Sequence, residues 1–106
     1  MMKFMFHANY SPAGNQGVLA DGGTSRQNAV AALAESLGGS LESFYFVLGG
    51  DEGIAICDLP SAEAATALAM TVGATGAAEL RTTALLTPSS VDAATKLSAA
   101  YRAPGA

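Results

Sequence analysis

Two neighbouring carboxylates, Asp51 and Glu52, stand among glycines in the stretch Gly49-Gly50-Asp51-Glu52-Gly53. Two acids can serve as general acid and general base when a shielded pocket drives their pKa values apart. Adjacent residues of a strand point to opposite faces, however, and glycine-rich turns face water. We therefore expect these two acids to form the solvated tip of a hairpin, with acid–base catalysis as the alternative.

A second set of reactive groups depends on the pleat of residues 3–9. This segment alternates between an apolar side that carries Phe4 and Phe6 and a second side that carries His7, which is the period of a strand. If the apolar side packs on helices, the imidazole lies on the open face of the sheet. Polar groups in an otherwise apolar cleft are typical of a small-ligand site. The ligand-binding residues that we predict on this face are His7, Asn9, Ser43, Tyr45 and Arg81. An inert, hydrogen-bonded His7 at a subunit interface is the alternative.

Three further features have simpler interpretations. Residues 22–26 could bind an anion at a helix start beside Arg26, but a capping box from Thr24 to Gln27 explains the same residues, and we expect capping. Cys57, the only cysteine, lies in an apolar strand and is expected to act as a small hydrophobe. One histidine and one cysteine cannot build a structural zinc site, so no metal is predicted. A haem on His7 has little support, and no cofactor is identified.

The elements that position these groups follow one another in a simple order. Apolar runs predict four strands, and capping signals with helical periodicity predict a helix after the first strand, another after the third and a last one after Thr87-Pro88. The glycine-rich connection 11–23 is long enough to be a lid. The predicted strands cover residues 3–9, 41–48, 53–57 and 80–86.

This order, β-α-β-β-α-β with an extra C-terminal helix, is that of the ferredoxin-like, α+β plan. It predicts an antiparallel sheet with strand order 4-1-3-2, two helices on one face, and an open second face. On the last helix, Val91 and Ala94, with Tyr101 beyond them, are expected to lie on the buried side.

Composition limits the possible partners. The 106 residues suit a single domain, residues 1–106, and half of them are apolar while 13% are charged. A surface so poor in charge favours a homodimer or higher homo-oligomer through the open sheet face. The net charge of −4, with scattered basic residues, argues against nucleic acid. The uncharged stretch 64–78 is too short to span a membrane, no signal-peptide core is evident, and a single cysteine fits the cytoplasm.

Several stretches resemble one known family. Residues 22–26 (GGTSR), 35–46 (ESLGGSLESFYF), 55–60 (AICDLP) and 80–94 (LRTTALLTPSSVDAA), with the acidic hairpin, are similar to the GYD domain family of small bacterial proteins over residues 3 to about 95. The resemblance implies a dimeric α+β barrel type of domain and no settled activity. The Gly-Tyr-Asp signature is altered here to Gly-Gly-Asp-Glu, with Asp51 at the tyrosine position. Chemistry that required that phenol would lack it, whereas the acidic tip is kept.

Together these features favour small-molecule binding, with or without a cofactor-free reaction, in a cleft on the open sheet face at or near a dimer interface. The alternative hypothesis is a non-catalytic oligomerisation or interaction module, since no strong catalytic motif is present.

Overall fold

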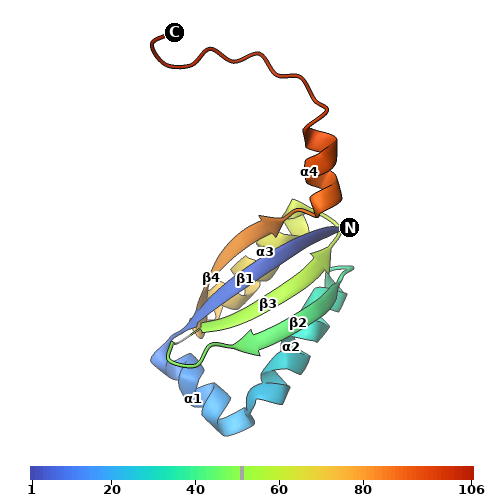
Figure 1. Cartoon of the computed structure of the whole chain (residues 1–106). Coiled ribbons are helices and arrows are strands. Elements are labelled where there is room, and N and C mark those ends of the chain that lie inside the picture. The colour runs from blue at the N-terminus through green and yellow to red at the C-terminus, as the bar shows by residue number, and fades with distance from the viewer. Residues whose placement is uncertain (51) are drawn as a thin grey trace.

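The computed structural model describes residues 1–50 and 52–106, which form four strands and four helices (Figure 1). Asp51, one half of the acidic pair, lies outside the described residues. In chain order the elements are β1 (Met2–Tyr10), α1 (Pro12–Asp21), α2 (Gly23–Ser36), β2 (Ser40–Phe46), β3 (Glu52–Leu59), α3 (Ala62–Ala74), β4 (Ala78–Leu85) and α4 (Pro88–Ala94).

The four strands form one antiparallel sheet with β1 at its centre. β1 pairs with β3 on one side and with β4 on the other, and β2 pairs with β3. The order is therefore β2-β3-β1-β4, which reads 4-1-3-2 from the β4 edge. The fold is α+β, and its element order is compatible with the ferredoxin-like plan.

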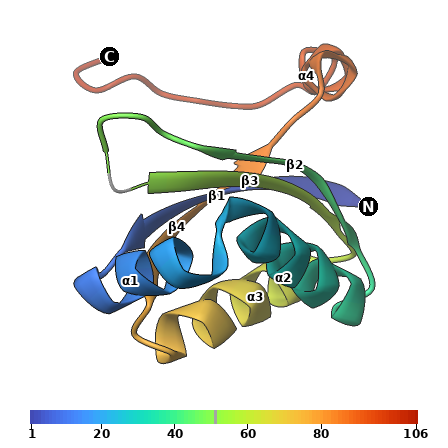
Figure 2. The same ribbon diagram turned by 90° about the horizontal axis from the view of Figure 1, so that it is seen from below.

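Helices cover only one face of this sheet. Figure 2 shows α1, α2 and α3 together on that face, while α4 and the C-terminal tail lie on the other side. Two covering helices were predicted, and α1 is a third. The segment 11–23, predicted to be a glycine-rich connection long enough for a lid, is mostly helix. Ser11 caps this helix: its hydroxyl accepts a hydrogen bond from the Gly14 N–H at 3.1 Å, and Pro12 occupies the first turn.

The start of α2 also differs from the prediction. The helix begins at Gly23 with Gly22 as its N-cap, and no side chain caps it, so the capping box from Thr24 to Gln27 is wrong. Gly22 has φ 84°, in the left-handed region where glycine is favoured. The chain uses this residue to turn directly from α1 into α2.

The core confirms the predicted pleat of the central strands. Phe4 and Phe6 of β1 are buried against the helices, and β3 alternates strictly between buried and half-buried positions. Cys57 and Leu59 of β3 and Leu68 of α3 complete the apolar layer. His7 therefore lies on the face away from the helices, as expected.

The C-terminal helix α4 is present but does not pack as predicted. Thr87 caps it and Pro88 opens it, in agreement with the sequence. However, none of its residues is buried: Val91 is 50% exposed, Ala94 is also exposed, and Tyr101 in the following tail is 81% exposed. The expected buried side was wrong because α4 projects beyond the sheet (Figure 1). The chain has a radius of gyration of 17.0 Å, whereas about 13 Å is usual for this length.

Candidate functional site

The open face of the sheet carries all five predicted ligand-binding residues. His7 pairs with Arg81 on β4 and with Ile54 on β3, and Tyr45 on β2 pairs with Ile54 in turn. These side chains form one row across all four strands. Ser43 lies opposite Ile56, in the next row toward Lys3. Asn9 lies opposite Glu52, in the next row in the other direction.

His7 occupies an unusual position within this row. Its side chain is only 15% exposed although no helix of the chain covers it, and its Nδ1 atom is buried without a hydrogen-bond partner among the described residues. The nearest acid among the described residues is Glu52, whose Oε2 lies 3.7 Å from Nδ1, too far for a direct hydrogen bond. Leaving a buried polar atom without a hydrogen bond costs free energy, so a hydrogen-bonding partner for this nitrogen would stabilise the folded protein.

Glu52 is a residue that the sequence interpretation misplaced. It was expected in the solvated hairpin tip, but it begins β3, pairs with Asn9 and is only 35% exposed. The strand was predicted to begin at Gly53 because the apolar run starts only after that glycine. In the structure β3 begins one residue earlier, at Glu52. Alternation across the pair Asn9–Glu52 could have placed this carboxylate beside His7 from the sequence.

A compact ion cluster occupies the far end of the open face. The Lys3 Nζ atom lies 2.9 and 3.1 Å from the two carboxylate oxygens of Asp58 and 3.2 Å from Glu42 Oε1. The hydrogen bond to Asp58 is the largest cause that raises the pKa of Lys3, and the hydrogen bond to Glu42 is the second. A β-bulge between Leu41 and Ser43 gives Glu42 its place beside the lysine. Arg81, by contrast, has no acidic partner within 4 Å among the described residues.

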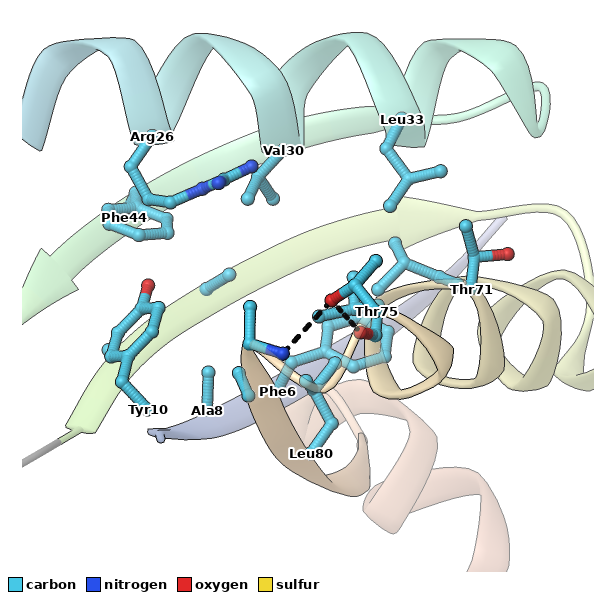
Figure 3. A pocket seen from close by; sticks show the side chains of 16 residues that line it. Phe6, Ala8, Tyr10, Arg26, Val30, Leu33, Phe44, Thr71, Thr75 and Leu80 are labelled. Carbon is cyan, nitrogen blue, oxygen red and sulfur yellow. Dashed lines mark hydrogen bonds between the residues drawn. The ribbon is translucent and has the colours of Figure 1, made fainter. Parts of the chain in front are cut away.

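A cavity of about 240 Å³ lies on the opposite face, between the sheet and helices α2 and α3 (Figure 3). The sequence interpretation missed it. Small residues line part of its sheet side, where β1, β3 and β4 face the helices: Ala8, Gly53, Ala55 and Ala78. Ala8 and Gly53 are direct cross-strand partners, so the two strands leave space at this pair, while Phe6 and Tyr10 of β1 line the cavity on either side of it. The strand pattern predicts which residues face the helices, and the small residues at these positions are the signal that could have revealed the cavity.

Arg26, Tyr10 and Phe44 gather at one end of this cavity (Figure 3). Burial raises the pKa of Tyr10, and the nearby positive charge of Arg26 acts in the opposite direction. Gly53 leaves room for the phenol, since a Cβ atom there would lie 3.1 Å from the Tyr10 hydroxyl oxygen. No acid lies within 4 Å of the Arg26 guanidinium in the described part of the chain.

Thr71 and Thr75 lie toward the other end of the cavity (Figure 3). The Thr75 hydroxyl is already engaged, because it donates to the Val72 carbonyl at 2.7 Å and accepts from the Ala77 N–H at 3.1 Å. The charged and phenolic groups of the lining therefore lie at the Arg26 end, and Thr71 adds a hydroxyl toward the other end.

Cys57 behaves as the predicted small hydrophobe. Its side chain is fully buried, and burial raises its pKa from 9.0 to about 11, so the thiol stays protonated and unreactive at neutral pH. Across residues 1–50 and 52–106, no group of three or more His, Cys, Asp or Glu side chains is placed to hold a metal ion.

The geometry defines a class: a small α+β domain with one helix-covered face that holds an apolar cavity, and one open face that holds a polar row. Within that class, the chain matches the GYD domain over residues 4–95 and belongs to the GYD domain family, which confirms the predicted resemblance. No curated protein matches the sequence. In the described part of the chain, no helix is both long and apolar enough to cross a bilayer.

Proposed function

We propose that the protein is a small-molecule-binding domain that self-associates, in the manner of a dimeric α+β barrel, through its open sheet face. In this proposal the ligand occupies the cleft between the paired faces and meets His7, Asn9, Ser43, Tyr45 and Arg81. The observation that carries it is the buried Nδ1 of His7, which has no hydrogen-bond partner among the described residues and lies on a sheet face that none of the described helices covers. A ligand or partner group that donates to or accepts from this nitrogen would remove the cost of leaving it unpaired.

The apolar content of the open side supports self-association. Met5, Ile54 and Ile56 are half-buried residues in the middle of the face, flanked by the ion cluster at one end and by Glu52 at the other. The chain beyond β4, which includes α4 and the C-terminal tail, lies on this side of the sheet (Figure 2) and contains further large, exposed apolar residues. The most exposed of these are Leu86 (72%), Leu97 (79%) and Tyr101 (81%). Apolar surface of this kind marks protein–protein contact sites.

The row beside the apolar residues supports ligand binding. An imidazole, a guanidinium and a phenol, from His7, Arg81 and Tyr45, would offer both donors and acceptors within an apolar surround. An interface alone has no need for these three groups in one row. We place this activity in a reducing bacterial cytoplasm, which the single, buried thiol of Cys57 suits.

The association is tested by sedimentation velocity. Ile56→Glu puts an acid in the centre of the open face, where it would meet its own copy across a two-fold axis, and we expect it to shift the protein to monomer. Met70→Glu is the matched control, because Met70 is 69% exposed on the helix side. A wild-type protein that stays monomeric at all concentrations, or equal effects of the two variants, would refute the pairing.

The ligand is tested separately with His7→Ala and Arg81→Ala. Native mass spectrometry of the freshly purified wild type should show bound small molecules, and both variants should lose them while remaining dimers. A thermal-shift screen of metabolites should give hits that both variants lose. If the variants retain every ligand of the wild type, the predicted site is wrong.

The second candidate function is an oligomerisation or interaction module without ligand chemistry. The apolar centre formed by Met5, Ile54 and Ile56 favours it, since these residues suffice to pair two faces. It predicts a dimer that Ile56→Glu breaks and that carries no small molecule, with no effect of His7→Ala or Arg81→Ala on any screen.

A further inference from the structure

The cavity under α2 and α3 lies on the other side of the sheet from the proposed open-face site. Phe6 and Ala8 of β1 face it, whereas His7 between them points away. A ligand in this cavity would meet none of the five open-face residues. Whatever it binds is therefore independent of the proposed function.

The lining of the cavity selects for hydrocarbon. Figure 3 shows Val30 and Leu33 of α2 on one side and Phe6 and Leu80 of the sheet on the other. A cavity of about 150 Å³ with such walls is large enough to bind benzene. A volume of about 240 Å³ accommodates a six-carbon chain or a ring with a short substituent.

One end of the cavity selects for a negative charge. Arg26 is the only charged residue among the described residues that line it, and Tyr10 adds a hydroxyl donor beside it. An arginine holds a carboxylate through two parallel hydrogen bonds, and such charge-assisted bonds are about twice as strong as neutral ones. No described acid within 4 Å competes for the guanidinium.

We propose that this cavity is a binding site for a small amphipathic monocarboxylate, with its hydrocarbon part between the sheet and helices α2 and α3 and its carboxylate on Arg26 and Tyr10. The apolar walls exclude a highly polar metabolite, because they would leave its hydrogen-bonding groups unpaired. The single cation at one end selects an acid over an amine or a neutral lipid.

The test uses hexanoate and its neutral counterpart, 1-hexanol, titrated into the ¹⁵N-labelled full chain and followed by amide chemical shifts. Butanoate, octanoate and phenylacetate extend the series. We expect saturable shifts in β1, α2 and α3, with hexanoate bound more tightly than hexanol.

Two variants separate the charge from the cavity. Arg26→Gln should weaken hexanoate binding roughly tenfold or more and leave hexanol unchanged, since only the carboxylate uses the guanidinium. Ala8→Leu places a larger side chain in the hollow and should weaken both probes. Ala55→Val does the same if Ala8→Leu fails to fold. The matched controls are Arg102→Gln in the exposed tail and Ala32→Leu on the exposed side of α2, and neither should change binding.

The outcomes are decisive in both directions. The proposal is overturned if none of the four carboxylates gives saturable shifts at millimolar concentration, or if Arg26→Gln binds hexanoate as the wild type does. It is also overturned if the cavity-filling variants bind both probes normally. His7→Ala should bind hexanoate like the wild type, so failure of the open-face site and failure of this one can be told apart.

Discussion

The covered face of the sheet has two unlike ends, although both are built from the same two strands. At one end Phe4 pairs with Cys57, and both are nearly or fully buried, at 4% and 0% exposed. At the other end Ala8 pairs with Gly53 over the cavity. The backbone ladder is continuous between them, so the two ends differ in side-chain size and not in strand pairing.

This contrast separates stability from binding within one layer. The packed end, with Cys57, Leu59 and Ala34 each 0% exposed, makes the dense contacts that hold a small domain together. The hollow end gives up such contacts, and Arg26 and Tyr10 line one end of the cavity. Variants that act on one end and spare the other test whether the two roles are separate.

The largest expected difference comes from the same truncation at each end. Leu59→Ala at the packed end should lower the free energy of unfolding by about 2–5 kcal/mol, because it removes a fully buried side chain and leaves a void. Leu33→Ala, on the cavity wall and half-buried, should cost roughly 1 kcal/mol, since the space beside it is already open. Urea unfolding under reducing conditions measures both. Equal losses would mean that the cavity end is packed as tightly as the core.

The next effect is a pH dependence at the packed end. The folded-state pKa of Cys57 is raised to about 11 from 9.0, so the unfolded chain loses its thiol proton first as the pH rises. Stability from this group is complete below pH 9 and is lost between pH 9 and about 11, by about 3 kcal/mol at most.

Cys57→Ala provides the control for this titration. This variant has no thiol, so it should not lose stability through thiol titration as the pH rises. The difference in unfolding free energy between wild type and variant should therefore change across the pH interval in which the thiol titrates. At neutral pH a thiol reagent should label Cys57 only as fast as the protein unfolds. Rapid labelling of the folded protein would show that the packed end is not sealed.

Strand pleating made much of the fold predictable. The alternation in residues 3–9 placed Phe4 and Phe6 inward and His7 outward, and the cap signal at Thr87 marked α4 correctly. These are local rules, in which each residue's neighbours in sequence decide its position. The five open-face residues share a face for the same reason.

Features that depend on distant contacts were missed. Helix α1 contains Gly14 and Gly17, which disfavour a helix locally, and its position depends on a contact with Ala77 some sixty residues later. The cavity needs three strands to present small residues at one place, which no single segment reveals. We predicted a buried side for α4 because we assumed that other residues of the same chain would bury an apolar side chain such as Val91.

The last predicted effect concerns the wall of the cavity. The Ser11 N–H donates to the Ala77 carbonyl at 2.9 Å, and a Cβ atom on Gly14 would overlap that same oxygen. Because Ala77 lines the cavity, Gly14→Ala should displace α1 from it and lower the free energy of unfolding by about 1–3 kcal/mol.

Gly17→Ala is the matched control in the same helix. Nothing lies within 4 Å of a Cβ there, so this variant should stabilise the protein by about 0.5–1 kcal/mol through its higher helix propensity. Thermal unfolding measures both variants, and hexanoate titration of the folded proteins adds a second readout. If α1 supports the hollow end, Gly14→Ala weakens hexanoate binding while Gly17→Ala does not. If binding survives Gly14→Ala unchanged, the contact between α1 and Ala77 serves folding alone, and the cavity is shaped by α2, α3 and the sheet.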